Sequence, residues 1–107
     1  MTKPIRFARE ARAEVIEAAH WYERQRHELR AEFLASLDDA VDRVRRLGHS
    51  LAILPGSEPD APIRRIELQR FPCSLVFIEL PTRIRVLAVA HDRRRPGYWR
   101  DRGRAAD

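Results

Sequence analysis

The chain has 107 residues, of which 44% are hydrophobic and 35% are charged. This length allows one domain with a single modest core, spanning residues 1–107, and it excludes a second domain. The 21 basic and 16 acidic side chains give a formal net charge of +5. The one cysteine, Cys73, excludes an internal disulfide and favours a reducing compartment; it opens an apolar run, so we expect a packed structural thiol.

The positive charge is unevenly distributed along the chain. Residues 1–60 carry ten basic and eleven acidic side chains, whereas residues 61–107 carry eleven and five. A polyanion is the natural partner for such a C-terminal half, and a solvated basic surface is the plainer alternative. No segment resembles a signal peptide, and the apolar runs fall short of the ~20 residues that span a bilayer. We therefore expect a cytoplasmic protein without membrane contact.

The first half of the chain predicts a strand and two helices. Residues 5–7 form a short strand candidate after a proline. Apolar side chains then recur every three or four positions over residues 10–26, and more clearly over residues 29–47, which predicts two amphipathic helices. The second pattern ends near Gly48, a plausible C-cap. Because few residues separate the two patterns, we expect an antiparallel helical hairpin.

The second half predicts a loop and three strands. Residues 48–62 contain three prolines and two glycines and must be a loop. The apolar period then changes to two, which predicts strands over residues 63–69, 74–80 and 83–91. The helices can cover only one face of this sheet, so the other face should present Arg65, Glu67 and their neighbours.

The residues that carry chemistry are mainly arginines. The four histidines are scattered without the spacing of a metal site, and no glycine-rich phosphate loop occurs, so we expect neither a metal nor a cofactor. What remains is a constellation after the second and fourth predicted strands: Arg64, Arg65, Arg70, His91, Arg93, Arg94, Arg95, Tyr98 and Trp99.

A structural interpretation exists for each member of this constellation. Tyr98 and Trp99 could cap the open end of the core, and we favour this packing role for Trp99. His91 could bond a backbone carbonyl. The arginines could pair with Asp92 and Asp101.

Two long segments resemble the RelE/ParE superfamily of toxins from bacterial type II toxin–antitoxin modules. They are ARAEVIEAAHWYERQRHELRAEFLASLDDAVDRV and the region from RRIELQRFPC to VLAVAHDRRRPGYW, so that the likeness runs roughly from residue 4 to residue 100. It implies an α+β fold of order β-α-α-β-β-β, in which the helical hairpin packs on a twisted antiparallel four-stranded sheet. It also implies a cognate antitoxin protein as partner, in a hetero-oligomer.

One branch of this superfamily cleaves mRNA on the ribosome without a metal. That chemistry needs a base, cations around the phosphate and an acid. By resemblance, Arg70 would clamp the phosphate, His91 would transfer a proton, and Arg94 or Tyr98 would complete the catalytic set. The sequence departs from this branch in having no lysine in the sheet region.

The other branch poisons DNA gyrase and performs no chemistry of its own. Its members have a long helical hairpin and a last strand that ends as in AHDRR. Contacts to gyrase or its bound DNA would come from Arg64, Arg65, Arg70, Arg93, Arg94 and Arg95. We favour this ParE-like branch; the alternatives are a RelE-like endonuclease acting on the ribosome and mRNA, and a non-toxic binding module on the same fold.

Overall fold

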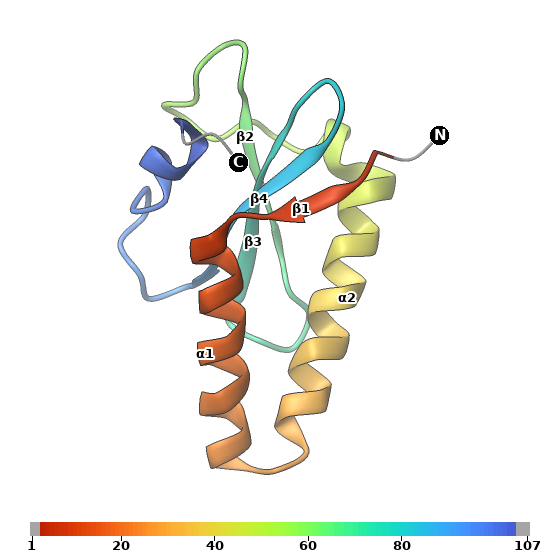
Figure 1. Cartoon of the computed structure of the whole chain (residues 1–107), viewed down its shortest axis with the longest axis vertical. Helices are drawn as coiled ribbons and strands as arrows, with labels where there is room; N and C mark the ends of the chain where they lie inside the picture. The colour runs from red at the N-terminus through yellow and green to blue at the C-terminus, as the bar shows by residue number, and fades with distance from the viewer. Residues whose placement is uncertain (1–2, 105–107) are drawn as a thin grey trace.

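The computed structural model describes residues 3–104 and confirms the predicted order of elements (Figure 1). The helices and strands are β1 (Ile5–Phe7), α1 (Arg9–Gln25), α2 (Leu29–Leu47), β2 (Ile63–Glu67), β3 (Cys73–Glu79) and β4 (Ile84–His91). Two short 3-10 helices, η1 (Gly48–Ser50) and η2 (Arg100–Arg104), follow α2 and β4. The fold is therefore α+β, with the helical hairpin packed on one sheet.

The sheet has the strand order β1-β4-β3-β2 and is mixed. The antiparallel meander of β2, β3 and β4 is as expected, but β1 runs parallel to β4, with Ile5 opposite Ile84 and Phe7 opposite Val86. The expectation of a wholly antiparallel sheet is thus wrong at β1. The chain reverses between β2 and β3 and again between β3 and β4, so β4 runs in the direction of β2. β1, which is parallel to β4, therefore also runs in the direction of β2. Parallel strands need a long crossover connection, and here the helical hairpin provides it.

The two helices cover one face of the sheet. α1 contributes small residues at this contact, Ala11 and Ala19, which let it approach the strands closely, whereas α2 contributes the larger Phe33 and Leu37. The predicted end of α2 is confirmed, but Gly48 has an ordinary helical φ of −52°. Its role is close approach, because a Cβ there would lie 3.2 Å from the ring of Phe77.

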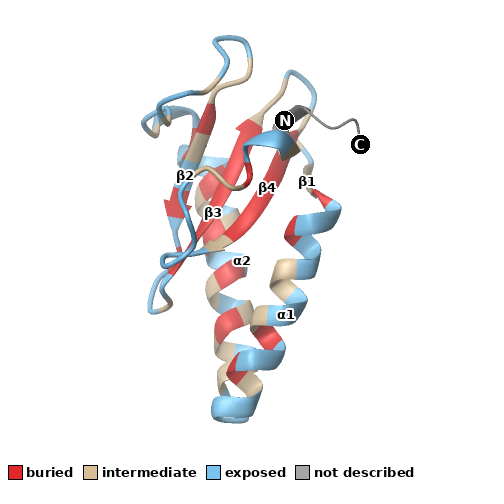
Figure 2. Ribbon diagram, turned by 90° about the vertical axis from the view of Figure 1, so that its left-hand side faces the viewer, coloured by how far each residue is buried: buried red, intermediate tan, exposed pale blue. Residues whose placement is uncertain are grey.

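The opposite face of the sheet is partly covered by the chain that follows β4. Trp99 is buried there in a second apolar cluster with Val76, Ile78 and Leu87. Figure 2 shows the result, with buried residues concentrated on the two central strands, β3 and β4. Only the β2 edge of this face keeps exposed charge, at Arg65 among others, so the expected open face is smaller than the sequence suggested.

Candidate target-binding site

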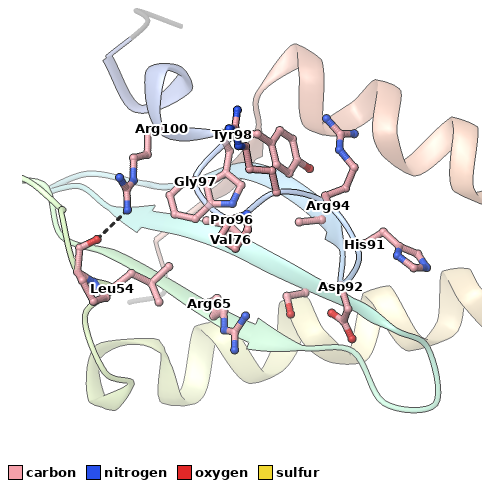
Figure 3. Close-up of a pocket in the computed structure, with 15 residues that line it drawn as sticks. Leu54, Arg65, Val76, His91, Asp92, Arg94, Pro96, Gly97, Tyr98 and Arg100 are labelled. Carbon is pink, nitrogen blue, oxygen red and sulfur yellow. Dashed lines mark hydrogen bonds between the residues drawn. The ribbon is translucent and has the colours of Figure 1, made fainter.

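A hollow of about 320 Å³ lies on the face of the sheet opposite the helices (Figure 3). We call it the arginine pocket. Its basic lining comes from β2, the end of β4 and the segment after it: Arg65, His91, Arg94, Arg95 and Arg100. Its floor includes Ser74 and Val76 of β3, and Trp99 forms a wall. The structure thus gathers arginines from two separate segments, β2 and the chain that follows β4, around one hollow.

Strand alternation and a turn place these side chains. Arg65 pairs in register with Val76, and Ser74 pairs with Ala90, so their side chains share the face away from the helices. After β4, the backbone N–H of Arg94 donates to the carbonyl of His91 at 2.9 Å and turns the chain back. Gly97 adopts a φ of +87°, which glycine tolerates best, and the chain then inserts its tryptophan.

Four arginines of this region have no ion-pair partner among the residues that the structure describes. Within the described part of the chain, no carboxylate lies within ion-pair distance of Arg65, Arg93, Arg94 or Arg95. The structural interpretation in which these arginines pair with Asp92 and Asp101 is therefore wrong among the residues that the structure describes. Like charges held close together repel one another, and a bound anion relieves that repulsion while forming charge-assisted hydrogen bonds. The pocket is suited to an anionic partner.

Ser74 lies in the pocket floor with an unsatisfied hydroxyl. The residue is 3% exposed, and its Oγ is a buried side-chain atom without a hydrogen-bond partner among the residues that the structure describes. A buried hydroxyl without a partner costs free energy, which a ligand oxygen in the pocket would return. Sequence analysis did not single out Ser74, because a serine in an apolar strand looks like ordinary packing.

Tyr98 is held by hydrogen bonding and by stacking. Its hydroxyl donates to Oε2 of Glu14 at 2.7 Å, and the guanidinium carbon of Arg94 lies 3.9 Å from its ring centroid. Burial, reinforced by the bond to Glu14, raises the pKa of Tyr98 above its ordinary value. The phenol is thus a poor source of a proton for a substrate. The packing role predicted for its neighbour Trp99 is confirmed.

His91 ends β4 and is exposed to solvent. Its Nδ1 accepts the backbone N–H of Arg93 at 3.0 Å, so the neutral ring carries its proton on Nε2. The sequence suggested a bond to a backbone carbonyl instead; the ring accepts from a backbone amide.

Three of the predicted site arginines, Arg64, Arg70 and Arg93, do not line the arginine pocket. Arg70 sits in the β2–β3 turn with a φ of +73° and pairs with Glu32 of α2 at 3.1 Å. Arg64 donates from Nε to the carbonyl of Leu51 at 2.9 Å. The structure therefore brings together three of the six predicted contact arginines, together with His91 and Tyr98. It does not bring Arg70 to the other predicted catalytic residues.

A second hollow, of about 380 Å³, lies between α1 and the end of β4. Trp21, Tyr22, Cys73 and Val89 line it, and Arg94 borders both hollows. Burial is the main cause that raises the pKa of the Cys73 thiol, so this cysteine is not activated, as expected for a structural residue.

Sequence analysis missed two residues near the arginine pocket: Glu14, which accepts the Tyr98 hydroxyl, and Arg102, which pairs with Glu14. Glu14 falls within the apolar stripe of α1, between the buried Ala11 and the half-buried Ala18. A carboxylate on a helix stripe that faces the core needs a hydrogen-bond donor, so the position of Glu14 was the sequence feature that could have revealed its role.

Among the described residues, no helix is both long and apolar enough to cross a membrane.

Comparison with known proteins supports the fold. No protein-family model matches the sequence, and no curated protein matches it. One chain of the solved structure of the chromosomal ParDE TA system from P. aeruginosa superposes with a TM-score of 0.68 at 19% sequence identity. The match covers 84% of this chain and 96% of that chain. Apart from the parallel β1, the α+β fold implied by the resemblance to the RelE/ParE superfamily is thereby confirmed: this chain has the fold of a chain in a ParDE toxin–antitoxin system.

Proposed function

We propose that the chain is the toxin of a type II toxin–antitoxin module and inhibits growth until a cognate antitoxin binds it. The fold shared with a chain of a ParDE system supports this proposal. So does the pocket of unpaired arginines, because cations without partners cost stability and are retained where a target needs them.

Within this class, the toxin acts by binding, as a ParE-like poison of DNA gyrase. The observation that carries this choice is that Arg70 lies apart from His91, Arg94 and Tyr98, the other catalytic candidates. Acid–base cleavage needs its acid and base within hydrogen-bond reach of one phosphate. Arg70 is engaged by Glu32 outside the arginine pocket, and the Tyr98 phenol is engaged by Glu14. The remaining guanidiniums suit contacts to gyrase or to its bound DNA.

A RelE-like endoribonuclease is the second candidate, and one observation favours it. His91 lines the same hollow as Arg65 and Arg94, so an imidazole and two cations could surround one phosphate. The candidates differ in the fate of His91→Gln. In a gyrase poison, no proton moves on the toxin, and the variant should keep most of its inhibition. In a nuclease, loss of a general acid or base should cost about 10²–10⁴-fold in rate.

The deciding experiment applies the purified protein to two targets in parallel. Incubated with gyrase and plasmid DNA, it should block supercoiling and leave broken DNA. Incubated with translating ribosomes, it should leave the transcripts intact. Transcripts cut within codons, together with normal supercoiling, would replace the gyrase proposal with the nuclease. Absence of both effects, in a protein that cells also tolerate at high expression, would argue against a toxin altogether.

The antitoxin is tested separately. Co-expression with the product of a small neighbouring open reading frame should restore growth and yield a stable hetero-oligomer. A neighbouring product that neither binds nor restores growth would remove this part of the proposal.

A further inference from the structure

Glu14 connects α1 to two segments that lie about 75 to 88 positions away in the sequence. Its Oε1 accepts the backbone N–H of Val89 and the guanidinium of Arg102, both at 3.0 Å, and its Oε2 accepts the Tyr98 hydroxyl at 2.7 Å. The Glu14 side chain is only 15% exposed, and that of Arg102 is 17% exposed. This carboxylate is consequently screened from water far more than a surface ion pair.

The same contacts close an open edge of the sheet. β1 follows β4 only as far as Val86, whose carbonyl accepts the N–H of Ala8. Beyond that point, the Leu87 carbonyl accepts Arg102, and the Val89 amide donates to Glu14. Two side chains thus supply the hydrogen bonds that a longer β1 would have made.

The contacts extend from Glu14 to the arginine pocket through one aromatic ring. The Tyr98 hydroxyl is fixed by Glu14, and Arg102 lies 5.0 Å from the ring centroid. Arg94 lies 3.9 Å from the same centroid. This stacking is the contact that holds the Arg94 guanidinium among the described residues, since it has no carboxylate partner there.

We propose that Glu14 is a positioning residue of the arginine pocket: acting through Tyr98, it pre-orders Arg94 for binding the target. A flexible arginine loses rotamer entropy when it binds, whereas one already stacked on a fixed ring has lost much of it. The predicted effect of Glu14 on target binding rests on the proposed function, whereas its predicted effect on the order of the Arg94 side chain does not.

The contact itself is tested by titrating Tyr98. The chain has only two tyrosines, so Tyr22→Phe leaves Tyr98 as the single phenol seen by absorbance. Glu14 stabilises the protonated phenol, so Glu14→Gln should let Tyr98 ionise at lower pH. Glu17→Gln, an exposed change on the same helix, should leave the titration unchanged. Equal titrations in all three proteins would overturn the proposal.

The positioning of Arg94 is measured directly by NMR order parameters of arginine Nε–Hε groups. Glu14→Gln and Tyr98→Phe should both loosen Arg94, because the first weakens the charge-assisted bond that fixes the ring and the second removes it. Arg93, which stacks on no ring within the described part of the chain, should not change. An Arg94 as ordered in E14Q as in the unmodified protein would exclude Glu14 as a positioning residue.

A double-mutant cycle then tests whether Glu14 affects target binding through Arg94. With purified gyrase on DNA as the probe, E14Q should weaken binding by up to about tenfold, the size of one immobilised side chain. In an Arg94→Gln background, E14Q should cost nothing further. An equal loss in both backgrounds would assign Glu14 to stability alone. Loosening of Arg94 without any gyrase binding would refute the proposed function and leave the positioning role intact.

Discussion

Ser74 occupies a place in β3 where an alanine would pack without leaving a hydroxyl unpaired. The side chain is buried, it lines the arginine pocket, and the described chain offers its Oγ no partner. An unsatisfied hydroxyl lowers stability rather than raising it. If the target occupies the arginine pocket as proposed, we expect one of its oxygens to make the missing bond.

Ser74→Ala should therefore leave the free energy of unfolding unchanged or slightly raised, within about 0.5 kcal/mol, while weakening inhibition. Ser36→Ala is the matched control, because the Ser36 Oγ donates to the carbonyl of Gln69 at 2.6 Å. That control should lose about 1 kcal/mol in chemical denaturation, with inhibition retained. A destabilised S74A protein would show that the Ser74 hydroxyl has a partner within the fold.

Arg70 illustrates how an arginine can be prominent in sequence and remote from the pocket. Its φ of +73° strains any side chain, and its ion pair with Glu32 is exposed. Both Arg70→Ala and Arg70→Gly lose the ion pair, but only glycine relieves the backbone. The glycine variant should be more stable than the alanine variant by up to about 1 kcal/mol. Both should still inhibit growth fully, whereas Arg65→Ala, which removes the same charge inside the arginine pocket, should inhibit growth more weakly.

At the scale of elements, periodicity predicted nearly every helix and strand because it is a local property. The helix over residues 29–47 has the predicted bounds, and the last strand begins one residue later than expected. The direction of β1 was missed because its pairing with β4 joins positions 79 apart in the chain. The Glu14–Tyr98 bond was missed for the same reason, since it spans 84 positions.

The segment after β4 is the element that turns a sheet face into a pocket, and Trp99 anchors it. Trp99 is buried against Val76 and Leu87, whereas Trp21 on α1 is 49% exposed. Trp99→Ala should cost about 3 kcal/mol of stability and remove the wall of the arginine pocket. Trp21→Phe should cost less than about 0.5 kcal/mol. Thermal unfolding of the two variants, followed by circular dichroism, compares them directly, and a W99A protein as stable as W21F would mean that the segment is not docked in solution.

At the scale of the whole molecule, ion pairing separates two kinds of arginine. On the helical hairpin, Arg43 pairs with Asp39, Arg46 pairs with Asp42, and the charges largely cancel. On the opposite side of the sheet, the arginines of the pocket have no such partners in the described chain. The positive charge of Arg65, Arg94 and Arg95 is therefore gathered on one side of the sheet.

This asymmetry predicts how target binding depends on salt. If Arg65, Arg94 and Arg95 each neutralise one DNA phosphate in the gyrase complex, the logarithm of affinity should fall with the logarithm of salt concentration at a slope of about −3. Arg65→Ala should weaken binding and reduce the steepness by about one. Arg45→Ala, which removes an exposed charge from α2, should change neither. Titrations between 50 and 200 mM salt, roughly the range over which such slopes are resolved, measure all three proteins. A slope near zero would show that the arginines contact neutral groups of gyrase. The pocket would then recognise a protein surface instead of the DNA phosphate backbone.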